Sequence, residues 1–134
     1  MSAIDSGAPI RADGIARRFD GRMVLDGVDL EVPQGSVTAL LGRNASGKSA
    51  LLRILVGLLP RTAGTARGGG LDPARDGVEL RRHVGYVADR LDVSACMRVS
   101  GWLRFQPPFF PTWSGTTERG LLELLSLDPM SRTE

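Results

Sequence analysis

Hydrophobic and polar positions along the first third of the chain follow the pattern of strands and turns. Residues 10–19 read as extended chain, and residues 24–32 alternate in part, which predicts a half-buried strand. Asp20-Gly21 between them is a turn signal. The apolar run at 36–41 is bounded by glycines and predicts a buried strand that leads into a glycine-rich loop.

From Lys48 onward the apolar spacing changes to that of a helix. Leucines recur at helical intervals and predict a helix over 48–58 that stops before Pro60. The pattern then predicts a short edge strand and turn at 62–70, a short helix at 76–82, a second buried strand at 84–88, and helices at 99–105 and 116–127. A strand, a glycine-rich loop, a helix and a later strand together favour an α/β fold.

Composition agrees with an ordinary globular domain. The chain has 134 residues, of which 42% are hydrophobic and 24% charged, and its net charge is +2. This small surplus, with no Lys/Arg block longer than two residues, argues against a nucleic-acid-binding surface. The lone Cys96 favours a reducing compartment. Met1–Pro9 shows no secretory signal, and the longest nearly apolar stretch, Ala50–Leu59, is half a membrane span, so we expect no integral membrane segment.

A phosphate-binding loop follows the expected strand at 36–41. Its residues fit G-x-x-x-x-G-K-S/T without a mismatch: Gly42, Arg43, Asn44, Ala45, Ser46, Gly47, Lys48 and Ser49. Glycines allow successive backbone N–H groups to converge on an anion, and the helix that begins there adds the positive end of its dipole. The motif predicts that Lys48 reaches the β- and γ-phosphates and that the Ser49 hydroxyl helps to hold Mg²⁺.

The basic residues support this assignment. Sixteen of the seventeen are arginine, and Lys48 is the single lysine. Lysine is a compact point charge, which fits a tight phosphate cradle better than a planar guanidinium does. The alternative is a glycine-rich turn without a ligand.

The sequence on both sides of the loop narrows the choice of family. Residues 24–42 read V-L-D-G-V-D-L-E-V-P-Q-G-S-V-T-A-L-L-G, and residues 51–60 read L-L-R-I-L-V-G-L-L-P. Both blocks resemble the nucleotide-binding subunit of ATP-binding cassette (ABC) transporters, over nearly the whole chain from Ile10. The resemblance implies an α/β P-loop NTPase fold of ABC type, with an antiparallel front sheet and part of a parallel core sheet.

The resemblance also assigns roles to single residues. Phe19 matches the aromatic position that stacks on adenine in this family, and the alternative is a core phenylalanine at a strand end. Ala45 adds a Cβ where glycine is common, and Ala50 replaces a threonine whose hydroxyl helps to hold the α-phosphate. We therefore expect ATP binding that is retained but weakened, because one hydrogen bond is worth about 0.5–1.5 kcal/mol.

Asp89 has two interpretations. Residues 82–89, R-H-V-G-Y-V-A-D, align with the family's R-x-I-G-Y-V-P-Q, whose last residue contacts Mg²⁺, and F-F-P-T-W at 109–113 resembles a branch with an acidic residue there. The resemblance therefore implies that Asp89 joins Ser49 at the metal. Four mostly apolar residues ending in Asp are also typical of a Walker B strand, which is the alternative in a small, complete NTPase similar to GTPases.

Three family motifs do not occur in these 134 residues: L-S-G-G-Q, a Walker B strand ending in Asp-Glu, and a switch histidine. We therefore expect one partial cassette, with a nucleotide-binding core at about 10–88 and the Gln-loop region and start of the helical subdomain at about 89–134. The chain would bind ATP and Mg²⁺ without turnover, and the resemblance assigns it no catalytic residue of its own.

The resemblance further implies how the parent protein works. The family couples ATP binding and hydrolysis to transport through a membrane permease, with two cassettes closing head to tail at the cytoplasmic face of the membrane. Residues 90–113 would face the permease, although their aromatic side chains equally suit the small core of a helical subdomain. A fragment of a soluble ABC-type ATPase and a non-catalytic nucleotide-binding module are the remaining alternatives. The transported substrate is not encoded in this segment.

Overall fold

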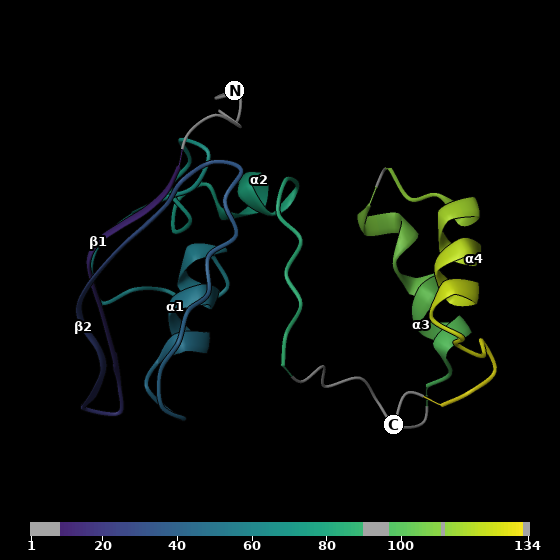
Figure 1. Cartoon of the computed structure of the whole chain (residues 1–134), viewed down its shortest axis with the longest axis horizontal. Coiled ribbons are helices and arrows are strands. Elements are labelled where there is room, and N and C mark those ends of the chain that lie inside the picture. Colours follow the sequence, from purple (N-terminus) through teal and green to yellow (C-terminus); the bar gives the residue numbers. More distant parts are fainter. Residues whose placement is uncertain (1–8, 90–96, 111, 133–134) are drawn as a thin grey trace. The chain divides into compact units, whose positions relative to one another are not determined.

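The computed structural model describes residues 9–89, 97–110 and 112–132. The chain divides into two units, Met1–Val87 and Ala88–Glu134, which Figure 1 draws in purple to teal and in green to yellow. Cys96 and the first part of the segment expected to face a permease lie outside the described residues.

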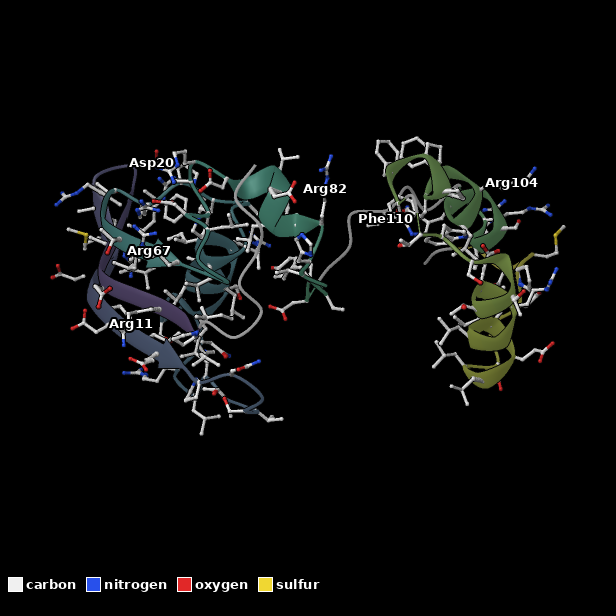
Figure 2. All side chains as sticks on the ribbon, turned by 90° about the horizontal axis from the view of Figure 1, so that it is seen from above. Arg11, Asp20, Arg67, Arg82, Arg104 and Phe110 are labelled. Atoms are coloured by element: carbon white, nitrogen blue, oxygen red, sulfur yellow. The ribbon has the colours of Figure 1, made fainter. Side chains whose placement is uncertain are left out.

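A three-stranded antiparallel sheet forms the front of the first unit. The strands are β1 (Ile10–Phe19), β2 (Arg22–Val32) and β3 (Ala63–Arg67), in the order β2-β1-β3. Asp20 and Gly21 join β1 to β2 with φ values of +45° and +82°, as in the two-residue turns that match the twist of a hairpin. Figure 2 shows Arg11 and Asp20 at opposite ends of this hairpin. The antiparallel front sheet predicted from the sequence is confirmed.

Helix α1 (Lys48–Leu55) covers one face of this sheet (Figure 1). The core is made by residues from both layers: Ala12, Ile15, Leu25, Leu51, Ile54, Leu55 and Ala66. A helix of eight residues is not stable alone in water, so packing of Leu51, Ile54 and Leu55 holds it in place. Each such side chain contributes about 1.5–3 kcal/mol when fully buried.

Helix α1 ends three residues earlier than its leucine pattern predicts. Gly57 adopts a left-handed φ of +70°, and its N–H donates to the Ile54 carbonyl at 3.1 Å. The N–H of Leu58 donates to the Arg53 carbonyl at 2.8 Å. These two bonds form a Schellman cap, which stops the helix although leucines continue beyond it.

The prediction of buried strands at 36–41 and 84–88 is wrong. Neither segment belongs to a strand, and Val37, Leu41 and Val87 are almost fully exposed. A strand requires ladder hydrogen bonds from a neighbour, and the described residues provide none for either segment. The parallel part of the expected core sheet is therefore not formed within the described part of the chain.

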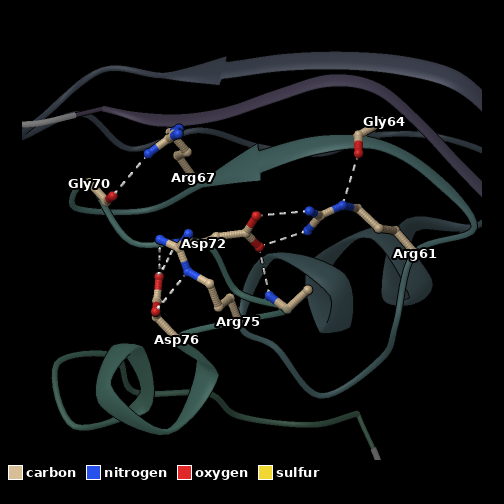
Figure 3. A network of polar contacts seen from close by, with 8 residues as sticks. Arg61, Gly64, Arg67, Gly70, Asp72, Arg75 and Asp76 are labelled. Atoms are coloured by element: carbon tan, nitrogen blue, oxygen red, sulfur yellow. Dashed lines mark hydrogen bonds and ion pairs between the residues drawn. The ribbon is translucent and has the colours of Figure 1, made fainter.

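A polar network closes the loop between β3 and helix α2 (Gly77–Arg81), as Figure 3 shows. The Arg61 guanidinium donates to both carboxylate oxygens of Asp72, at 2.9 and 2.8 Å, and to the Gly64 carbonyl at 2.9 Å. The Ala74 N–H also donates to Asp72. The hydrogen bonds from Arg61 are the main cause that lowers the pKa of Asp72 to about 2.

The second unit is helical. It contains α3 (Val99–Phe105), a short 3₁₀ turn η1 (Pro107–Phe109) and α4 (Gly115–Leu124). Helix α4 starts one residue before the predicted position, because the Ser114 hydroxyl accepts a hydrogen bond from the Thr117 N–H at 3.2 Å. After α4 the chain returns to α3, where the Ser100 N–H donates to the Pro129 carbonyl at 2.9 Å.

Aromatic rings of the second unit contact one another near η1. The ring centroids of Phe105 and Phe109 are 5.2 Å apart, and those of Phe110 and Trp113 are 6.2 Å apart. Phe105, Phe109 and Phe110 are still about half exposed. Among the described residues, no helix is both long and apolar enough to cross a membrane.

The Arg61–Asp72 pair predicts a specific dependence of stability on pH. We expect Asp72→Asn to lower the free energy of unfolding at neutral pH by about 1–2 kcal/mol, because the shift of the Asp72 pKa measures how strongly the fold favours the carboxylate. The pKa is lower in the folded chain than its ordinary value of 3.8, so this stabilisation is complete above pH 4 and is lost as the pH falls through about 2.

Urea unfolding between pH 7 and pH 2 checks this expectation, with wild type losing more stability on acidification than Asp72→Asn. Glu31→Gln is the matched control, because it removes an exposed partner of Arg11 and should change stability by less than about 1 kcal/mol. The same acid sensitivity in wild type and Asp72→Asn would contradict the assignment.

Candidate functional site

The glycine-rich loop at 42–49 lies against the edge of β2 and leads into α1. Gly47, the residue before the helix, has a φ of +92°. A Cβ at this position would lie 2.6 Å from Leu25 Cδ2 and 2.9 Å from the Val24 carbonyl oxygen. Only glycine fits both the conformation and the space, so the second glycine of the motif is required by packing as well as by any ligand.

The first part of the loop is a tight turn. The Ser46 N–H donates to the Arg43 carbonyl at 3.2 Å, and a Cβ on Gly42 would lie 2.9 Å from Ser46 Oγ. Ala45, one of the residues that depart from the family pattern, has a left-handed φ of +62°. This conformation costs an alanine about 1–2 kcal/mol relative to a right-handed one. The departure noted in the sequence therefore falls on a strained position of the loop.

Lys48 turns back over the mouth of this loop. Its ammonium Nζ donates to the carbonyl oxygens of Gly42 and Arg43, both at 2.7 Å. The sequence motif predicted a lysine at the phosphates but not these two bonds. They hold the positive charge against the first two residues of the loop.

The start of α1 adds a second source of positive potential. No side chain caps its N-terminus and its first turn contains no acidic residue. The backbone N–H groups of this turn and the helix dipole therefore favour an anion here. Ser49 is exposed in the first turn, which is where the motif requires a hydroxyl for Mg²⁺, and Ala50 follows it with a partly buried methyl group.

Phe19 lies in the same unit as the loop, at the end of the hairpin's first strand. It ends β1 and is 39% exposed. Arg17 pairs with Leu25 across the β1–β2 ladder, and Leu25 is the residue that contacts Gly47. Leu25 thus connects β1 with the loop, and Phe19 and the loop residues lie in the same unit.

Sequence reasoning missed Arg17. Its guanidinium carbon lies 4.4 Å from the centroid of the Phe19 ring, within the range of a cation–π contact. The signal was present, because residues two apart on a strand share a face. Once Phe19 was chosen as a candidate, Arg17 was its neighbour.

Asp89 and Ser49 belong to different units of the chain. Asp89 is exposed and belongs to the second unit, whereas Ser49 belongs to the first. Among the described residues, no three His, Cys, Asp or Glu side chains form a group that could hold a metal by themselves. A shared magnesium site of Ser49 and Asp89 remains a prediction.

Gly47 provides a test of the loop geometry. We expect Gly47→Ala to lower the free energy of unfolding by at least about 1–2 kcal/mol, because alanine disfavours this φ and its Cβ would collide with β2. Binding of Mg-ATP should fall with it. Urea unfolding and calorimetric titration measure the two effects.

Gly120→Ala in α4 is the matched control. Its new Cβ would meet nothing within 4 Å, and the change should stabilise the helix by about 0.5–1 kcal/mol. Wild-type stability in Gly47→Ala would show that the contact with β2 is not a constraint.

Comparison with known proteins agrees with this geometry. Residues 25–106 match the family described as "ABC transporter". The aliphatic sulfonates import ATP-binding protein SsuB 1 of Streptomyces avermitilis is 50% identical over 82 residues, which are 61% of this chain and 28% of that protein. The Fe(3+) ions import ATP-binding protein FbpC 3 of Rhodococcus jostii is 36% identical over 129 residues, 90% of this chain and 35% of that protein. The chain thus spans about a third or less of these curated relatives.

A solved structure described as the ATP binding subunit of an ABC transporter has the same fold. It superposes with a TM-score of 0.74 and 22% sequence identity, over 93% of this chain and 54% of the other. The resemblance seen in the sequence and the predicted fold class are both confirmed. Since the family match runs from β2 through the phosphate loop to α3 and covers more than half of the residues, the chain belongs to the ABC transporter family.

Proposed function

We propose that this chain carries the ATP-binding part of an ABC transporter's nucleotide-binding subunit, and that the loop at 42–49 binds the phosphates of Mg-ATP. The observation that carries the proposal is the position of the Lys48 ammonium, held 2.7 Å from two loop carbonyls above the start of α1. A polyphosphate suits this site for two further reasons. Gly47 packs directly against β2, and the start of α1 has no side-chain cap.

Each candidate residue has a role in this proposal. The Lys48 ammonium exchanges carbonyl partners for the β- and γ-phosphate oxygens, and the backbone N–H groups of the loop and first turn, from Arg43 to Ala50, hold the phosphates. The exposed face of Phe19 stacks on adenine.

The site also fits magnesium. Mg²⁺ usually takes only one or two protein ligands and completes its shell with phosphates and waters, so a lone hydroxyl such as that of Ser49 is sufficient. When bound, the ion would neutralise charge on the phosphates. We assign Asp89 as a second contact to the ion, on the strength of its position in the sequence pattern.

The two units suit two parts of a cassette. We assign the first, at about 10–88, to the nucleotide-binding core and the second, at about 89–134, to the Gln-loop region and the start of the helical subdomain. Half-exposed Phe105, Phe109 and Phe110 suit a contact with a permease, and the names of SsuB 1 and FbpC 3 describe import ATP-binding proteins. We further propose a head-to-tail partner cassette and a peripheral position on the cytoplasmic face of the membrane.

Removing the lysine tests the binding site. We expect Lys48→Ala to weaken Mg-ATP about ten- to a hundred-fold, because charge-assisted hydrogen bonds to the phosphates are lost. Isothermal titration calorimetry measures the affinity. Arg67→Ala is the control, since it removes an exposed cation of the same unit that lies outside the loop. Equal affinity in wild type and Lys48→Ala would overturn the assignment.

Hydrolysis by the 134-residue chain is expected to stay at background. A general base contributes about 10²–10⁴-fold and positioned groups at the γ-phosphate a similar factor, and these residues include neither L-S-G-G-Q nor a strand ending in Asp-Glu. The assay is phosphate release in excess Mg-ATP. Steady turnover that both Lys48→Ala and Asp89→Asn abolish would favour the alternative in which Asp89 is a Walker B residue.

A further inference from the structure

The tip of the β1–β2 hairpin presents a cation and an aromatic ring on one strand face. Residues two apart on β1 share a face, so Ile15, Arg17 and Phe19 form one row. Ile15 is fully buried under α1, Arg17 is half-buried, and Phe19 is 39% exposed. The row therefore runs from the core to the surface and ends at the ring.

The guanidinium of Arg17 lies over the ring of Phe19. The guanidinium carbon lies 4.4 Å from the ring centroid of Phe19. Its Nε is buried and has no hydrogen-bond partner, and within the described part of the chain its side chain forms no ion pair. A buried donor without a partner is unfavourable, so neither an ion pair nor a hydrogen bond accounts for this position, and the ring contact does.

The ring lies on the same strands that hold the phosphate loop. Arg17 is the ladder partner of Leu25, and a Cβ on Gly47 would meet the Leu25 side chain at 2.6 Å. A ligand whose phosphates occupy the loop is thereby anchored next to this part of the hairpin. The row from Arg17 to Phe19 can therefore distinguish ligands by the group that is attached to their phosphates.

We propose that Arg17 is a positioning residue for the nucleotide base, which acts by covering one face of Phe19 so that a purine stacks on the opposite face. This inference rests on the proposed ATP site. The guanidinium draws the ring's π density towards itself, which makes the opposite face less negative and a better partner for an electron-rich purine. It also holds the ring in one orientation, so less side-chain freedom is lost when the base binds.

The test compares a ligand with a base and a ligand without one. Calorimetric titrations of the 134-residue chain use Mg-ATP and magnesium tripolyphosphate as probes. We expect Arg17→Met to weaken ATP about three- to ten-fold, the range of a cation–π contact, and to change tripolyphosphate affinity less than two-fold. Arg17→Lys should recover part of the loss, because it keeps a cation near the ring.

Two further variants separate positioning from a merely structural role. In a Phe19→Ala background, Arg17→Met should have no additional effect on ATP, because the ring through which it acts is gone. Arg11→Met removes a cation from the other end of β1 and should leave the ratio of ATP to tripolyphosphate affinity unchanged. Circular dichroism melts check that each variant is folded.

The possible results separate a failure of this inference from a failure of the proposed ATP site. An unchanged affinity ratio in Arg17→Met, equal losses for both ligands, or a full effect of Arg17→Met without the Phe19 ring would each overturn the inference while the phosphate site stands. If wild type binds neither probe, or Lys48→Ala binds both as wild type does, the proposed function fails and the inference fails with it.

Discussion

The approach of Gly47 to β2 is the constraint on which the first unit depends. The backbone of the loop passes so close to Leu25 and the Val24 carbonyl that no side chain fits between them. This contact sets where α1 begins, and therefore which helix face meets the sheet and buries Ile54. The same contact places Leu25, the ladder partner of Arg17, beside the loop. Helix and loop are held against β2 in one arrangement because Gly47 lacks a Cβ.

Local signals in the sequence predicted the elements whose partners are near in the chain. Asp20-Gly21 marks the hairpin turn because both residues tolerate a positive φ. The helix at 99–105 has the predicted bounds. The prediction failed at 36–41 and 84–88. An apolar run indicates a preference for burial, but it does not indicate which strand would pair with it. Pairing is non-local, and the described residues hold no partner for either segment.

The residues of the candidate site also differ in how far the sequence predicts them. The candidate loop residues are contiguous, so spacing alone was enough to predict them. Phe19 was predicted only through the family resemblance, because its distance in sequence from Lys48 does not relate the two residues. The contact of Arg17 with the ring is visible only after Phe19 has been chosen. The bonds from Lys48 to the Gly42 and Arg43 carbonyls were missed, since a motif describes residue types and not how a side chain folds back on its own loop.

The single lysine has a consequence for covalent chemistry. Lys48 carries the only side-chain primary amine among the 134 residues, and that amine is engaged by two carbonyls at the mouth of the loop. An acylating reagent that attacks side-chain amines therefore has one target, and its rate reports how often these two bonds open. A lysine-specific protease likewise has one bond to cut, at the first turn of α1. The rates of both reactions therefore measure how often the loop opens around Lys48.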